Sequence, residues 1–153
     1  MKYILYTDGG SRGNPGPAAL GVVICRPADD HPKGDNGELE IVKRYSESLG
    51  ETTNNEAEYQ ALIFGLKKLK QVFGKEKMKQ AKLEMRLDSE LIVNQLNHEY
   101  KIEEPKLQKL FLQVWNLMLD FGPMKFVAIP REENKEADRL VNEALDKKQG
   151  KLL

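Results

Sequence analysis

Aspartates at the ends of two strand-like runs are the residues whose position first suggests chemistry. Asp8 follows MKYILYT, and Asp88 follows KLEMRL. In an open α/β sheet, ligands bind beyond the carboxyl ends of the strands. If these two strands are parallel neighbours, both carboxylates therefore point to one place. Two simpler roles stay open, because Asp8 could begin a turn and Asp88 could cap the helix that follows.

The segment TTNNEAEY holds two further acids, and helical spacing separates them. Thr53 and Glu56 match the capping box that begins many helices, so Glu56 has an adequate structural role. Glu58 instead shares a helix face with Leu62 and Leu66, which is the face expected to meet the core. An ionised carboxylate there is costly unless it is paired or binds a metal. Glu58 is therefore the better candidate for a functional acid.

A fourth acid, Asp138, lies on the last expected helix, on the same side as Val141 and Leu145. We expect Asn134 to cap this helix, which leaves Asp138 without a capping role. Two acids at strand ends and two on the inner faces of helices form a coherent set. Clusters of oxygen ligands of this kind bind hard divalent cations.

Hydrophobic periodicity indicates the elements that would position these acids. Three strand-like runs come first, and a polar loop, RPADDHPKGDNG, separates the second from the third, so we expect an antiparallel meander. Helical and strand-like patterns then alternate, which implies an α/β mixed sheet flanked by helices, in a single domain over residues 1–153. The expected strands are 2–8, 18–25, 38–48, 82–88 and 124–129, and the expected helices are 53–73, 89–96, 105–121 and 134–147.

Composition narrows the classes of function. The 24 basic and 24 acidic residues cancel, whereas modules that only bind nucleic acid are often strongly basic. Any phosphate-binding surface must therefore come from local segregation of charge. Neither a membrane span nor a signal peptide is expected. The single cysteine, Cys25, lies in an apolar run and is expected as a buried thiol, which favours a reducing, cytoplasmic setting.

Four segments resemble the motifs of type 1 ribonuclease H, and they occur in that family's order over most of the chain. The resemblance implies a five-stranded mixed sheet, with three antiparallel strands first, flanked by helices. It also implies an endoribonuclease that hydrolyses the RNA strand of RNA–DNA hybrids. The segments are TDGGSRGNPGPA (7–18), TNNEAEYQALIFGL (53–66), LDSELIVNQL (87–96) and PREENKEADRLVNEAL (130–145).

The same resemblance implies a catalytic metal site and its ligands. It assigns the family's four acids to Asp8, Glu58, Asp88 and Asp138, which agrees with the choice of Glu58 over Glu56 from helical phase. The implied cofactor is a pair of Mg²⁺ ions, for which Mn²⁺ can substitute. The implied chemistry is two-metal phosphodiester hydrolysis that leaves 3′-hydroxyl and 5′-phosphate ends.

Substrate contacts are implied for four polar residues. In the family, Asn14 lies beside the RNA backbone, and Asn54 and Asn55 contact RNA 2′-hydroxyls in the wide minor groove. Thr53 falls where the family contacts a DNA phosphate. The alternative is that residues 53–55 only begin a helix. Both can hold, because a helix N-terminus already presents free N–H groups to a phosphate.

The sequence departs from the family in two places. Many members carry a histidine on the loop about ten residues before the last aspartate, where this chain has Ala128. Many also carry a basic protrusion, and the stretch between Leu96 and Phe121 has no such cluster, so the chain resembles the shorter branch of the family. Trp115 in that stretch is expected to pack in the core. The expected partner is an RNA–DNA hybrid, bound by a monomer without a membrane or protein partner.

Two rival functions follow from the same residues. One is a nuclease of this fold that cuts another substrate, such as double-stranded RNA. The other is a catalytically inactive binding module, and the retention of all four acids argues against it.

Overall fold

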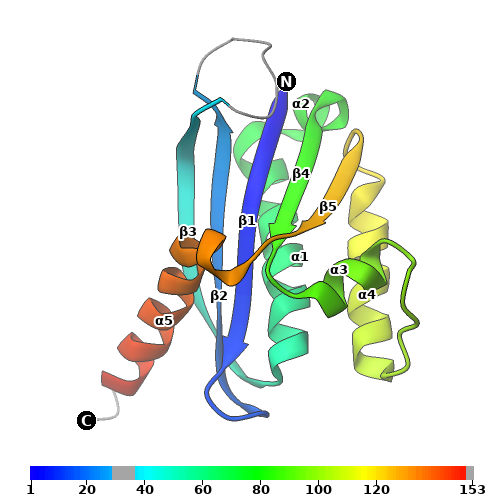
Figure 1. Cartoon of the computed structure of the whole chain (residues 1–153). Coiled ribbons are helices and arrows are strands. Elements are labelled where there is room, and N and C mark those ends of the chain that lie inside the picture. Colours follow the sequence, from blue (N-terminus) through cyan, green and yellow to red (C-terminus); the bar gives the residue numbers. More distant parts are fainter. Residues whose placement is uncertain (29–36, 151–153) are drawn as a thin grey trace.

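The computed structural model describes residues 1–28 and 37–150, and these residues fold around one five-stranded sheet of order β3-β2-β1-β4-β5 (Figure 1). The first three strands pair antiparallel, whereas β4 runs parallel to β1 and to β5. This confirms the expected mixed sheet with three antiparallel strands first. Most of the polar loop expected between the second and third strands lies outside the described residues. The strands are β1 (Lys2–Ser11), β2 (Gly16–Pro27), β3 (Leu39–Thr52), β4 (Lys82–Leu87) and β5 (Met124–Ala128).

Helices pack on both faces of this sheet (Figure 1). On one face, Leu62 of α1 and Val114 of α4 belong to the same buried cluster as Leu5 of β1. On the other face, Leu140 of α5 is buried with Val23 of β2. The burial of each large apolar side chain contributes about 2 kcal/mol, so the two clusters hold the helices against the sheet. The helical elements are α1 (Asn54–Phe73), α2 (Lys75–Gln80), α3 (Glu90–Leu96), α4 (Pro105–Met118), the 3-10 turn η1 (Arg131–Glu133) and α5 (Lys135–Gly150).

The register of the two central strands sets the positions of two acids. β1 and β4 are parallel neighbours, and their pairing places Tyr6 beside Arg86. Asp8 lies two residues after Tyr6, and Asp88 lies two residues after Arg86, so the two acids occupy equivalent positions on the neighbouring chains. Since side chains alternate between the faces of a strand, a step of two residues keeps each acid on the same face as its predecessor. The condition stated for the two aspartates, parallel neighbouring strands, is therefore met.

Two glycines allow the helices that carry the other acids to approach the sheet. A Cβ at Gly9 of β1 would overlap the carbonyl oxygen of Ala57 in α1, and a Cβ at Gly21 of β2 would overlap the carbonyl oxygen of Ala137 in α5. Each helix backbone thus lies directly against a strand. The residue next to each contact in the helix is an acid, Glu58 or Asp138.

Some expectations about the elements were wrong. The short helix α2 was not predicted, and α4 ends at Met118 rather than at Phe121. Trp115 is 50% exposed and not in the core. The reason is helical phase: its neighbour Val114 is buried in the core, and one residue further the helix has turned by about 100°.

The environment of Cys25 agrees with the expectation. Cys25 is a buried free thiol, and burial raises its pKa to about 11. Among the residues described, no helix combines the length and the apolar character that a membrane crossing requires.

Candidate active site and metal centre

Three of the four predicted acids meet at one point beside the C-terminal end of the β1–β4 pairing. Asp8, Glu58 and Asp88 each offer one carboxylate oxygen, and these oxygens all lie within 4.8 Å of one another. Asp8 and Glu58 are each only 7% exposed, and Asp88 is half-buried. The strand register supplies the two aspartates, and the close approach of α1 at Gly9 brings Glu58 to them.

The crowding of these carboxyl groups changes their proton affinities. The pKa of Asp8 is raised from 3.8 to about 7, chiefly by burial; its hydrogen bond with Glu58 acts in the opposite direction, and the charges of Asp88 and Asp138 raise it. The pKa of Glu58 is raised well above its ordinary 4.5, first by burial and then by the charge of Asp8. Without a cation, the pair therefore retains a proton near neutral pH, because two adjacent buried carboxylates resist full ionisation.

The cluster fits a divalent cation. No lysine or arginine forms an ion pair with Asp8, Glu58 or Asp88 within residues 1–28 and 37–150. The Oε2 atom of Glu58 is buried without a hydrogen-bond partner in this part of the chain. A buried carboxylate oxygen without a partner is costly, and a hard cation with oxygen ligands removes that cost.

Asp138 lies at the edge of this cluster. The structure corrects its expected placement: Val141 and Leu145 are buried, but Asp138 is exposed. It borders the same cavity as the other three acids, and it is close enough to Asp8 to form a hydrogen bond and to raise the pKa of that residue. The physical reason is that Asp138 lies at the edge of the apolar face of α5, on the side of the helix that borders the cavity.

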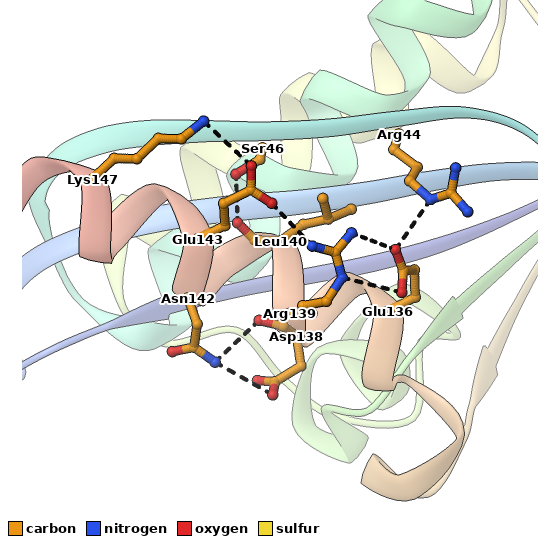
Figure 2. A network of polar contacts seen from close by, with 9 residues as sticks. All are labelled: Arg44, Ser46, Glu136, Asp138, Arg139, Leu140, Asn142, Glu143 and Lys147. Carbon is orange, nitrogen blue, oxygen red and sulfur yellow. Dashed lines mark hydrogen bonds and ion pairs between the residues drawn. The ribbon is translucent and has the colours of Figure 1, made fainter.

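Polar contacts fix the helix that carries Asp138 (Figure 2). Arg44 of β3 forms an ion pair with Glu136 at 3.1 Å, and the Ser46 hydroxyl donates to the carbonyl oxygen of Leu140 at 2.5 Å. The side-chain amide of Asn142 donates to the Asp138 carbonyl oxygen at 3.2 Å and to its Oδ2 atom at 3.4 Å (Figure 2). These contacts restrain both the helix and the Asp138 backbone.

Asn134 has a role that the sequence did not reveal. Its backbone carbonyl accepts the N–H of Asp138 at 3.1 Å, as expected at a helix start. Its side chain does not cap the helix, because Oδ1 is buried without a hydrogen-bond partner among the described residues. Instead Nδ2 donates to the carbonyl oxygen of Thr7 at 3.0 Å and to Oδ2 of Asp88 at 3.1 Å. No local pattern predicts such contacts, because both partners are far away in the sequence.

The beginning of α1 lies on another side of the cluster. Thr53 and Glu56 form the predicted capping box, which confirms the structural role of Glu56. The Asn54 backbone N–H donates to Oδ1 of Asn14 at 3.0 Å, and Oδ1 of Asn54 accepts from the Ser11 N–H at 2.9 Å and from its hydroxyl at 3.1 Å. Both carboxamide oxygens are therefore occupied, which leaves the amide N–H groups as outward donors.

A polar cavity of about 480 Å³ connects these features. Two of the predicted substrate-binding residues, Asn54 and Asn55, line it together with the four acids, whereas Asn14 and Thr53 lie outside its lining. The full lining consists of Asp8, Gly9, Gly10, Ser11, Arg12, Asn54, Asn55, Glu58, Asp88, Ser89, Arg131, Asp138, Val141, Asn142 and Leu145.

The mixed sheet with a carboxylate cluster beyond its central strands defines the class of ribonuclease H-like α/β proteins. A family model described as reverse transcriptase-like matches residues 6–144. The solved structure of LC11-RNase H1, isolated from compost by a metagenomic approach, is similar to this chain. The two sequences are 46% identical, and the TM-score is 0.83 over 97% of this chain and 98% of that one. This chain belongs to the ribonuclease H family.

Further relatives agree with this assignment. A second structure, of LC11-RNase H1 in complex with an RNA/DNA hybrid, is 44% identical, with a TM-score of 0.83 over 96% of this chain and 99% of that one. Ribonuclease HI of Halobacterium salinarum is 38% identical over 92% of this chain, which spans 63% of that protein. Bifunctional protein Rv2228c of Mycobacterium tuberculosis is 36% identical over 95% of this chain, which spans only 36% of that protein.

Proposed function

We propose that this chain is an endoribonuclease that hydrolyses the RNA strand of RNA–DNA hybrids and leaves 3′-hydroxyl and 5′-phosphate ends. The observation that carries the proposal is the largely buried cluster of Asp8, Glu58 and Asp88, with which no lysine or arginine of the described residues forms an ion pair. The nature of the substrate is supported by the related LC11-RNase H1, whose structure contains an RNA/DNA hybrid.

The four acids are the proposed ligands of two Mg²⁺ ions, with Mn²⁺ as a substitute. When bound, such ions supply positive charge that makes water more acidic and stabilises the charge on the reacting phosphate. Asp8 interacts with each of the other three acids, since Glu58, Asp88 and Asp138 all affect its pKa. Glu58 presents its unpartnered Oε2 from α1, and Asp138 contributes from α5 on the exposed side. No other general base from the protein is required.

Recognition of RNA is assigned to the start of α1 and the β1–β2 loop. Because protein N–H or hydroxyl donors occupy the carboxamide oxygens of Asn14 and Asn54, their amide groups face a substrate as donors. A 2′-hydroxyl oxygen in the minor groove accepts such hydrogen bonds, whereas DNA lacks that oxygen. Asn55 lines the cavity beside them. Thr53 lies at the positive end of the α1 dipole, where a DNA phosphate would be stabilised.

The proposal is tested by cleavage of end-labelled duplexes of one sequence, prepared as RNA–DNA hybrid, double-stranded RNA and double-stranded DNA. Each substrate is incubated with Mg²⁺, Mn²⁺, Ca²⁺ or chelator, and the product ends are identified by phosphatase treatment and ligation. We expect cleavage of the RNA strand of the hybrid in Mg²⁺ and Mn²⁺ only, with ligatable 5′-phosphate ends. Faster cleavage of double-stranded RNA would assign the site to the rival substrate, and hydrolysis that persists in chelator would refute the metal mechanism.

A further inference from the structure

Asn134 joins three of the four elements that carry the acids, namely β1, the end of β4 and α5. Its side-chain Nδ2 donates to the Thr7 carbonyl oxygen on β1 and to Asp88 Oδ2 at the end of β4. Its own carbonyl oxygen accepts the backbone N–H of Asp138 on α5. One residue thus contacts Asp88 through its side chain and Asp138 through its backbone, and it is bound to the residue that precedes Asp8.

The burial of Asn134 strengthens these hydrogen bonds. The residue is only 1% exposed, so water does not compete for the amide. A hydrogen bond from a buried amide to an ionised carboxylate is stronger than one between neutral groups. Since Nδ2 binds Oδ2 of Asp88 and the strand backbone together, the Asp88 carboxyl group is held in one rotamer. The same bonds hold the start of α5 at a fixed distance from β1.

We propose that Asn134 is a positioning residue of the metal centre: it orients the Asp88 carboxylate and sets the position of Asp138 relative to the other acids. The inference rests on the proposed function, because it concerns the same site. Asn134 does not border the cavity, so its effect passes through the acids and not through contact with the hybrid. Groups that orient a metal ligand in this way typically change metal affinity or activity about 10- to 100-fold when they are removed.

The test compares three variants of the whole chain. Asn134→Leu keeps a similar side-chain volume without a hydrogen-bond donor, and Asn134→Ala removes the side chain and tests the same loss if Leu prevents folding. Gln95→Leu is the matched control, since Gln95 is also a buried amide, 5% exposed, whose Oε1 accepts from the Tyr59 hydroxyl. Gln95 neither lines the cavity nor forms a hydrogen bond with an acid among the described residues. Mn²⁺ binding to the metal-free proteins is measured by calorimetry, and hybrid cleavage is measured as a function of metal and hybrid concentration.

We expect both Asn134 variants to bind Mn²⁺ roughly 10- to 100-fold more weakly and to require correspondingly more metal for half-maximal turnover, with the KM for hybrid nearly unchanged at saturating metal. Gln95→Leu should melt at a lower temperature and yet bind Mn²⁺ normally. If Asn134 had only a structural role, its variants would behave in the same way as this control. Mn²⁺ affinity within twofold of the unaltered protein in a folded Asn134 variant would overturn the inference. If the unaltered protein binds Mn²⁺ but does not cleave hybrid, the proposed function fails, while the calorimetry still decides the role of Asn134.

Discussion

Replacement of Asp8 by asparagine should stabilise the metal-free protein. Burial and the neighbouring acids raise the pKa of Asp8 from 3.8 to about 7, so the folded state binds a proton that the unfolded state releases in this range. The stability of the metal-free fold should therefore fall as the pH rises from about 4 to about 7. Because one pH unit corresponds to about 1.4 kcal/mol, the ionised Asp8 carboxyl group destabilises the fold by up to about 4 kcal/mol above pH 7.

Asparagine has nearly the shape of the protonated acid but cannot ionise, so Asp8→Asn removes this cost. The assay is urea unfolding of both proteins in chelator at several pH values between 4 and 9. We expect the two to have similar free energies of unfolding near pH 4 and to diverge as the pH rises, with the variant more stable by up to about 4 kcal/mol at pH 8. For a domain of this size that difference corresponds to roughly 8 to 16 °C in melting temperature. Mg²⁺ should stabilise the unaltered protein much more than the variant.

Asp120→Asn is the matched control, because the Asp120 side chain is 43% exposed and its pKa is lowered by the hydrogen bond from Lys70. Its replacement should lower the stability slightly at neutral pH, and the small loss should disappear in acid. A variant Asp8→Asn that is less stable than the unaltered protein at pH 8 without metal would refute the reasoning. In that case the Asp8 carboxylate would be a stabilising structural group and not a member of a strained metal centre.

Three further predictions concern turnover and binding. Glu58→Gln should lower the rate of hybrid cleavage by orders of magnitude, whereas Glu56→Gln should keep most of the activity, because Gln also fits a capping box. Single-turnover rates of the two variants test this ranking, and the reverse ranking would contradict the assignment of Glu58 to the metal site. Binding of hybrid, measured by fluorescence anisotropy in Ca²⁺, should weaken steeply with added salt. Tight binding at physiological salt would contradict this prediction and would indicate a basic binding surface. Ala128→His should raise steady-state turnover relative to the single-turnover rate, and turnover should then depend on pH between about 6 and 8. No rise in the folded variant would mean that another group, such as the cavity-lining Arg131, already assists product departure.

The geometry of the site could be predicted where it depends on periodicity. The strand-like runs identified Asp8 and Asp88, and their strands proved to be parallel neighbours. The expected strand end at Asp8 was wrong, because β1 continues to Ser11 through its pairing with β2. Helical phase separated Glu58, now seen to be buried with the aspartates, from Glu56, which completes a capping box. Ala128 ends β5 and is exposed, so a histidine at this position would not have to enter the core.

Other features could not be predicted, because they depend on contacts between distant segments. Helical phase placed Asp138 on the apolar side of its helix, but it could not show that this position borders the cavity and not the core. The side chain of Asn134 reaches Asp88 across 46 positions of the sequence, so local capping rules gave only its backbone role. Trp115 was misplaced because composition alone does not distinguish the two faces of α4.

The central claim, that the buried acids form a metal centre, is tested most directly by diffraction from crystals of the unaltered protein soaked in Mn²⁺, with anomalous differences measured at a wavelength sensitive to manganese. We expect an anomalous peak bounded by the carboxylate oxygens of Asp8, Glu58 and Asp88, and the loss of this peak in Asp8→Asn crystals treated identically. A map without a peak at these three acids, at a Mn²⁺ concentration that supports cleavage of hybrid, would contradict it.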